Sequence, residues 1–113
     1  MSIPNSYVSG TVFYPESMDR LAQVLTVAGF TVTIGQWALH LDGCARRFEL
    51  GYVGNITPEE PFQVEGDGFG VPVDSVAQCC ERLAQCLRER GIGYDFLHAT
   101  GQDEEIFAYQ FAP

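Results

Sequence analysis

Two segments of the chain place apolar residues at helical spacing. The first predicts a helix over residues 15–28, which begins at a proline and ends at Gly29. The second predicts a helix that begins at residue 74 or 75 and runs to residue 90, capped by Asp74 and ended by Gly91. The buried stripes of the two helices are Leu21, Val24, Leu25 and Ala28 in the first, and Val76, Cys80, Leu83 and Leu87 in the second.

Between and around these helices, apolar and polar residues alternate as they do in strands. Glycine-containing turns at residues 35–36 and 101–103 would join the strands into hairpins. The predicted strands cover residues 7–14, 31–34, 37–41, 47–53, 62–65, 94–98 and 106–111.

The two helices also resemble each other in sequence. Residues 19–25 read DRLAQVL and residues 81–87 read ERLAQCL, and each is followed by a glycine at the same distance. This similarity is compatible with a duplicated βαββ unit, with units 1–53 and 62–113 joined by a connection over residues 54–72 that is rich in Gly, Pro and acids. The expected fold is α+β: a two-layer sandwich in which both helices pack on one face of a mostly antiparallel sheet.

Composition narrows the classes of function. The chain has 113 residues, of which 46% are hydrophobic, so residues 1–113 are expected to form one domain. Fifteen acids oppose six arginines, lysine is absent, and the formal net charge is -9. This charge argues against direct nucleic-acid binding and against an anionic membrane surface. No signal peptide or apolar span is evident, and a cytoplasmic location is expected.

The four cysteines do not form an obvious disulfide framework, because three of them lie on the second predicted helix. Cys80 falls on the buried stripe of that helix, whereas Cys79 and Cys86 lie on a neighbouring stripe, and the sequence leaves their exposure open. No C-x-x-C pair that would suggest a zinc site occurs. A reducing compartment fits this pattern best.

No catalytic motif is present, so an enzyme is not the favoured interpretation, and no cofactor is expected. The glycine-rich segment 66–70 precedes a helix, as phosphate-binding loops do, but no lysine follows it. Glu65, Asp67 and Asp74 would repel a phosphate there.

A divalent-metal site is an alternative if the two units join symmetrically. His40, Glu49, His98 and Glu105 would then supply two imidazoles and two carboxylates. In outline the set resembles the paired-module metalloenzymes of the glyoxalase type, although the second unit is one strand short of their βαβββ pattern. Ordinary strand histidines, with His40 pointing to solvent and His98 at a wet edge, are the simpler interpretation.

Acidic residues and aromatics are the remaining candidates for a binding surface. The acids are expected to gather on one face and to attract a basic protein surface, with neighbouring aromatics excluding water from the contact. The candidate partner-binding residues are Glu59, Glu60, Glu65, Asp67, Phe69, Asp103, Glu104 and Glu105. Aromatics expected to be at least partly exposed are Tyr7, Tyr14, Tyr52, Phe69, Tyr94 and Tyr109.

Three functions therefore stay open from sequence. The first is a non-catalytic protein that neutralises a partner with a basic surface, in the manner of immunity proteins, antitoxins and phage-encoded inhibitors of CRISPR and other host defences. The second is a small-molecule or metal-binding module with a groove between the two units. The third is a homo-oligomeric subunit, for example a homodimer, whose sheets pair edge to edge or face to face.

Overall fold

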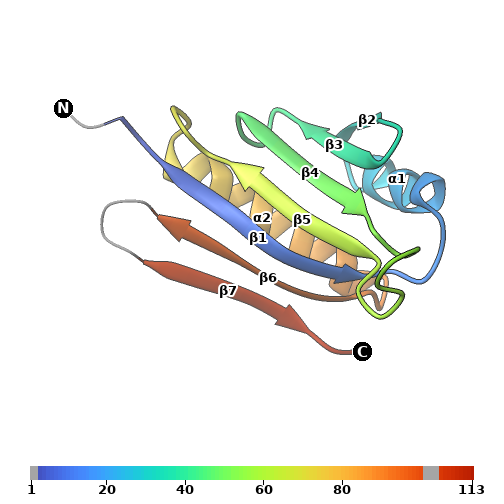
Figure 1. Ribbon diagram of the computed structural model, residues 1–113. Coiled ribbons are helices and arrows are strands. Elements are labelled where there is room, and N and C mark those ends of the chain that lie inside the picture. The colour runs from blue at the N-terminus through green and yellow to red at the C-terminus, as the bar shows by residue number, and fades with distance from the viewer. Residues whose placement is uncertain (1–2, 101–104) are drawn as a thin grey trace.

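Seven strands form one antiparallel sheet in the computed structural model, which describes residues 3–100 and 105–113. Figure 1 looks onto the sheet, and both helices lie behind it. Across the sheet the order is β2-β3-β4-β5-β1-β6-β7. In chain order the strands are β1 (Ser6–Phe13), β2 (Thr31–Ile34), β3 (Ala38–Asp42), β4 (Arg47–Tyr52), β5 (Phe62–Asp67), β6 (Gly93–Thr100) and β7 (Ile106–Phe111). The predicted two-layer α+β architecture is confirmed.

Helix α1 covers Met18–Val27, three residues shorter at its start than predicted. It begins late because Ser17 is the N-cap, whose side chain accepts a hydrogen bond from the Arg20 N–H. Helix α2 covers Val73–Glu89 and has Pro72 at its N-cap position, with no side-chain cap. The prediction that Asp74 caps α2 was therefore wrong, because Asp74 lies within the first helical turn.

Both helices end as the glycine pattern predicts. Gly29 and Gly91 have φ values of 100° and 69°, in the left-handed region that side chains disfavour. The next residue then bonds back over the last turn: the Phe30 N–H donates to the Leu25 carbonyl, and the Ile92 N–H donates to the Leu87 carbonyl. Phe30 and Ile92 are buried, so each helix end is attached to the core.

The core lies between the helices and one face of the sheet. Even-numbered residues of β1, β4, β5 and β6 point into it, because successive strand residues face opposite sides. Its fully buried large side chains include Leu21, Leu25, Leu39, Leu50, Phe62, Leu83, Leu87, Tyr94 and Phe96.

All four cysteines are buried and unpaired by disulfides. The sequence left the exposure of Cys79 and Cys86 open, and both are buried. Cys79 is hydrogen-bonded to Cys44 in the β3–β4 turn, and Cys86 faces α1. The Cys86 Sγ lies 4.0 Å from the Val24 carbonyl of α1, which shows the contact directly.

The sheet order does not confirm the duplicated unit. β6 lies beside β1, and a symmetric arrangement would place β2 beside β5. Instead β4 pairs with β5, and β3 separates β2 from β4. The predicted turn at residues 101–103 lies outside the described residues.

Candidate functional site

One face of the sheet has no helix over it, and we call it the open face (Figure 1). Strand alternation sends onto it the odd-numbered residues of β1, β4, β5 and β6 and the even-numbered residues of β3 and β7. The pattern places charged side chains on β3, β4 and β5, and uncharged ones on most of β1, β6 and β7. The open face thus has a charged half and a largely apolar half.

An ionic cluster occupies the charged half. The register sets Glu49 and Glu65 directly opposite each other on β4 and β5, where two like charges repel. Arg47 offsets this repulsion, with its Nη2 3.8 Å from a Glu65 oxygen and 4.0 Å from a Glu49 oxygen. His40 on β3 completes the cluster, with its Nδ1 3.5 Å from the other Glu49 oxygen.

A second group of contacts lies beside this cluster, at the end of β5. The Asp67 carboxylate accepts a hydrogen bond from the Phe69 N–H and lies 4.0 Å from the Arg46 guanidinium. That guanidinium also stands 5.8 Å from the centre of the Phe69 ring. Glu65, Asp67 and Phe69, three of the predicted partner-binding residues, are thus brought near one another.

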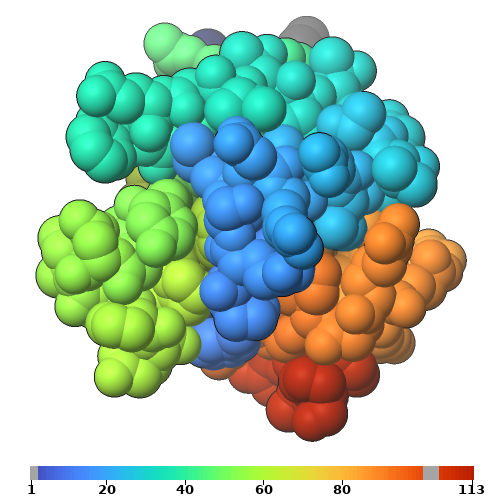
Figure 2. Space-filling view, turned by 90° about the vertical axis from the view of Figure 1, so that its right-hand side faces the viewer, coloured from blue at the N-terminus to red at the C-terminus, as the bar shows by residue number. Residues whose placement is uncertain are grey.

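The other predicted partner-binding residues lie elsewhere. Glu59 and Glu60 belong to the connection between β4 and β5, beside the ends of those strands (Figure 2). Glu105 precedes β7 at the opposite end of the sheet, where its carbonyl accepts a hydrogen bond from the Thr100 N–H. Asp103 and Glu104 lie outside the described residues. The predicted acids therefore do not form one compact patch.

Charge is nevertheless divided unevenly between the helix side and the sheet side of the molecule. The helices and their immediate flanks carry five acids and four arginines: Glu16, Asp19, Asp74, Glu81 and Glu89, with Arg20, Arg82, Arg88 and Arg90. The sheet and its connections carry, among described residues, eight acids and two arginines: Asp42, Glu49, Glu59, Glu60, Glu65, Asp67, Asp95 and Glu105, with Arg46 and Arg47. Figure 2 shows the 54–61 connection on the side away from α2. Most of the negative charge thus belongs to the sheet side.

The predicted metal set does not converge. His40 and Glu49 meet on the open face, but His98 pairs with Val8 and points into the core on the other side of the sheet. Glu105 precedes β7, which β5, β1 and β6 separate from β4. Within residues 3–100 and 105–113, no group of three or more metal-binding side chains comes together. The symmetric metal site was therefore wrong, because strand alternation separates the two histidines.

The burial of His98 also differs from the prediction that this histidine lies at a wet edge of the sheet. It is fully buried, and neither ring nitrogen has a hydrogen-bond partner in the described part of the chain. Burial lowers the pKa of His98, so the neutral imidazole is favoured. The sequence contained part of this signal, because His98 alternates in phase with the apolar Phe96, which is buried; Tyr94, which is also in phase, was expected to be partly exposed.

The thiols offer little nucleophilic chemistry. Burial raises the pKa of Cys80 to about 12 and raises that of Cys86. A hydrogen bond with Cys79, reinforced by burial, raises the pKa of Cys44, and the same hydrogen bond lowers that of Cys79 to about 7. Cys79 is only 8% exposed, so a reagent or substrate has poor access to its sulfur.

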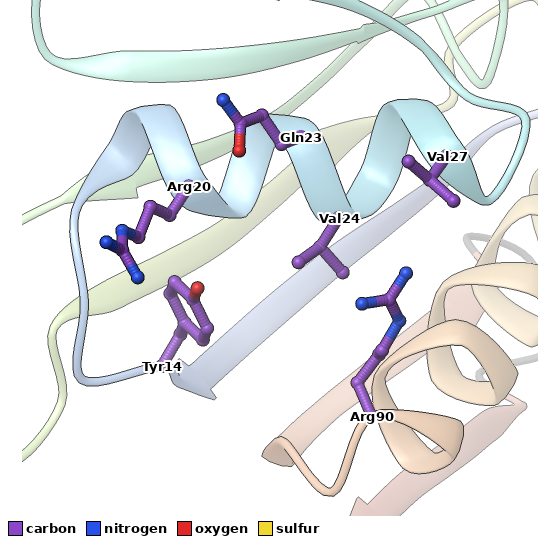
Figure 3. Close-up of a pocket in the computed structure, with 6 residues that line it drawn as sticks. All are labelled: Tyr14, Arg20, Gln23, Val24, Val27 and Arg90. Carbon is purple, nitrogen blue, oxygen red and sulfur yellow. The ribbon is translucent and has the colours of Figure 1, made fainter.

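A groove of about 460 Å³ runs between the two helices on the other side of the molecule (Figure 3). Arg20 of α1 and Arg90 at the end of α2 flank it, with Val24 between them. Arg20 is paired with Glu16 at 2.9 Å, and the Tyr14 hydroxyl donates a hydrogen bond to the same carboxylate. Two of the four arginines of the helix side therefore flank this groove.

The aromatics divide between surface and core. Tyr7, Tyr52 and Phe69 are exposed as predicted, and Tyr109 is half-buried. Tyr14 and Tyr94 are buried, so the expectation of partial exposure was wrong for them; both occupy even-numbered positions that face the helices. The exposed tyrosine of the open face is therefore Tyr7, next to Asp67 in the register.

Comparison of the chain with protein-family models, with characterised proteins and with solved structures finds no match. Over the described residues, neither helix combines the length and the apolar character needed to cross a bilayer.

Proposed function

We propose that this protein is a non-catalytic binding protein whose open face occludes a basic surface of a protein partner. The single observation that supports this proposal is the division of charge over residues 3–100 and 105–113: eight acids against two arginines on the sheet side, and five against four on the helix side. A field of this asymmetry orients the molecule during encounter, so that the open face meets a basic surface first.

The apolar half of the open face supplies the second requirement of an interface. Tyr7 and Ile106 are 54% and 63% exposed, and Ala99 lies between them in the register. Asp67 neighbours Tyr7 on the other side. Carboxylates next to exposed apolar side chains allow ion pairs to form where water is excluded, which makes them stronger.

Occlusion of a basic active or nucleic-acid-binding surface would make the protein an inhibitor, of the kind found among immunity proteins, antitoxins and phage-encoded inhibitors of CRISPR and other host defences. The partner would be a basic protein, and no cofactor would take part. The protein would act by covering the surface and would carry out no reaction.

The experiment separates the position of charge from its amount. Glu59→Lys/Glu60→Lys and Glu81→Lys/Glu89→Lys change the net charge equally, on the sheet side and on the helix side, and all four residues are exposed. The probe is a basic ribonuclease, and stopped-flow fluorescence measures its association rate at low salt. We expect the first variant to slow association at least about tenfold and the second to change it less than about twofold.

Equal slowing by the two variants would show that only total charge matters, and the division of charge between the sheet side and the helix side would lose its role. The natural partner can be identified by capture on the wild-type protein. We expect retention on Glu81→Lys/Glu89→Lys, release from Glu59→Lys/Glu60→Lys, and loss of the partner's own activity at one-to-one stoichiometry. Full partner activity in the saturated complex would reject inhibition.

A further inference from the structure

The edge strand β7 has an unusual composition for an exposed position. Its sequence IFAYQF contains no charge and no proline, and Ile106 and Phe107 are 63% and 46% exposed. Edge strands of soluble proteins normally carry Lys, Pro or a bulge that prevents pairing with another strand. Within the described residues, β7 pairs with β6 on one side and with no strand on the other.

The hydrogen-bond alternation shows which backbone groups β7 leaves unpaired. The Thr100 N–H donates to the Glu105 carbonyl, so this is a hydrogen-bonded pair of the β6–β7 ladder. In an antiparallel ladder such pairs alternate, which directs the odd-numbered residues of β7 towards β6. The N–H and C=O groups of Ile106, Ala108 and Gln110 therefore point away from the sheet. We call these six groups the β7 edge.

The same alternation, followed from the other side of the sheet, gives the same result. The Gly68 N–H donates to the Ser6 carbonyl, so the even residues of β1 bond to β5 and its odd residues bond to β6. Even residues of β6 must then bond to β7, as Thr100 does.

The opposite edge strand of the sheet, β2, leaves fewer backbone groups unpaired. The Gly35 N–H donates to the Ala38 carbonyl, which directs Thr31 and Thr33 of β2 towards β3. Only Val32 and Ile34 then present outward backbone groups. The β7 edge is both longer and more regular.

We propose that the β7 edge binds the β7 edge of a second copy of this chain, in an antiparallel pair with Ala108 opposite Ala108 of the second copy. This register sets Ile106 opposite Gln110 and uses all six outward groups of each strand. A register shifted by two residues leaves some of them unpaired. The symmetry axis is perpendicular to the sheet, so both open faces lie on the same side of one continuous sheet.

Side chains on both faces fit this register. On the helix side Phe107 meets Tyr109 of the second copy, and Tyr109 already stacks on Phe96 with ring centres 5.1 Å apart. On the open face Ile106 meets Gln110, whose amide is held by the Asp95 carboxylate at 3.2 Å. No two like charges stand opposite each other, and aromatic cross-strand pairs favour sheet formation.

Cross-linking tests both the pairing and the register. In the proposed dimer the two Ala108 Cα atoms are about 5.5 Å apart, within disulfide range. The two Gln110 Cα atoms are more than about 10 Å apart, because four residues of strand separate them. We expect Ala108→Cys to form a covalent dimer under mild oxidation and the equally exposed control, Gln110→Cys, to remain monomeric. Equal cross-linking of both variants, or of neither, would overturn the proposal.

A proline variant tests the hydrogen bonds. Ala108→Pro removes an N–H that points outward, so the β6–β7 ladder keeps its bonds. Light scattering should give about twice the chain mass of 12.5 kDa for the wild type and the single-chain mass for the variant, with the same circular dichroism. A wild type that stays monomeric at several hundred micromolar would overturn the proposal and leave the edge to a strand of another protein.

Discussion

The His98 side chain brings two ring nitrogens into the core, where neither has a hydrogen-bond partner among the residues that the structure describes. Its pKa is lowered by burial, whereas in the unfolded chain it has the ordinary value near 6.5. As the pH falls below about 6.5, the unfolded chain binds a proton at His98 that the folded protein does not bind, so the free energy of unfolding decreases. This loss continues until the pH reaches the lowered pKa of the folded state.

We predict that His98→Leu stabilises the protein by about 1–3 kcal/mol at pH 7, because it removes two unsatisfied polar atoms. The variant should also lack the loss of up to about 1.4 kcal/mol per pH unit that protonation causes in the wild type. Urea unfolding at pH 7.0, 6.0 and 5.5 measures both effects. His40→Gln is the control, since it keeps His98 and should keep the pH dependence. An unchanged pH dependence in His98→Leu would contradict this account.

At the scale of elements, β1 and β6 approach each other more closely than a side chain allows at one point. A Cβ on Gly10 would lie 2.3 Å from the Asp95 carbonyl oxygen and from the Phe96 Cα, and backbone atoms cannot move away independently. Gly51, in β4, has only the Gln63 carbonyl oxygen nearby, at 4.0 Å.

We predict that Gly10→Ala lowers the free energy of unfolding by about 3 kcal/mol, because β1 and β6 must separate. Gly51→Ala should stay within about 0.5 kcal/mol of the wild type or be slightly more stable, since the added methyl has room. Thermal and urea unfolding of both variants test this pair. A Gly10→Ala variant as stable as Gly51→Ala would show that β1 and β6 are farther apart than described.

Element boundaries were largely predictable because each depends on local chemistry. The strands at residues 31–34 and 106–111 are confirmed at both ends, and the two helices end at the predicted glycines. The start of α1 was missed, because the Ser17 side chain competes with the proline before it as the first-turn signal. Local patterns of this kind act over a few residues and can be read from the chain.

The order of the strands in the sheet, and the residues that meet across neighbouring strands, were less predictable, because both depend on contacts between distant segments. Nothing in residues 47–52 specifies that β4 pairs with β5 and thereby excludes β2 from that position. The ion pairs of Glu65 and Asp67 with Arg47 and Arg46 depend on β4 lying beside β5. The burial of His98, in contrast, follows from alternation alone.

For the whole molecule, the formal charge of -9 acts in opposite directions on its two proposed associations. Salt screens charges beyond a Debye length, which is about 10 Å at 0.1 M. Two copies of this chain repel each other, whereas a basic partner is attracted.

We predict that raising NaCl from 20 to 200 mM (about a threefold shorter Debye length) strengthens self-association and slows association with the basic probe. Sedimentation velocity at several protein concentrations measures the dimer dissociation constant, and stopped flow measures the association rate. Neutral sucrose of matched viscosity is the control. Two responses of the same sign would mean that net charge does not govern both contacts.

The central position of β1 also determines when the sheet can be completed. Its residues pair with β5 partners 50–60 positions later and with β6 partners 80–94 positions later. During synthesis β1 therefore stays unpaired until its neighbours, residues 62–67 and 93–100, have been made. Folding dominated by such distant contacts is slow. The uncharged β7 strand is made after the other six strands of the sheet, so its unpaired edge appears only when the strands that it joins have already been made.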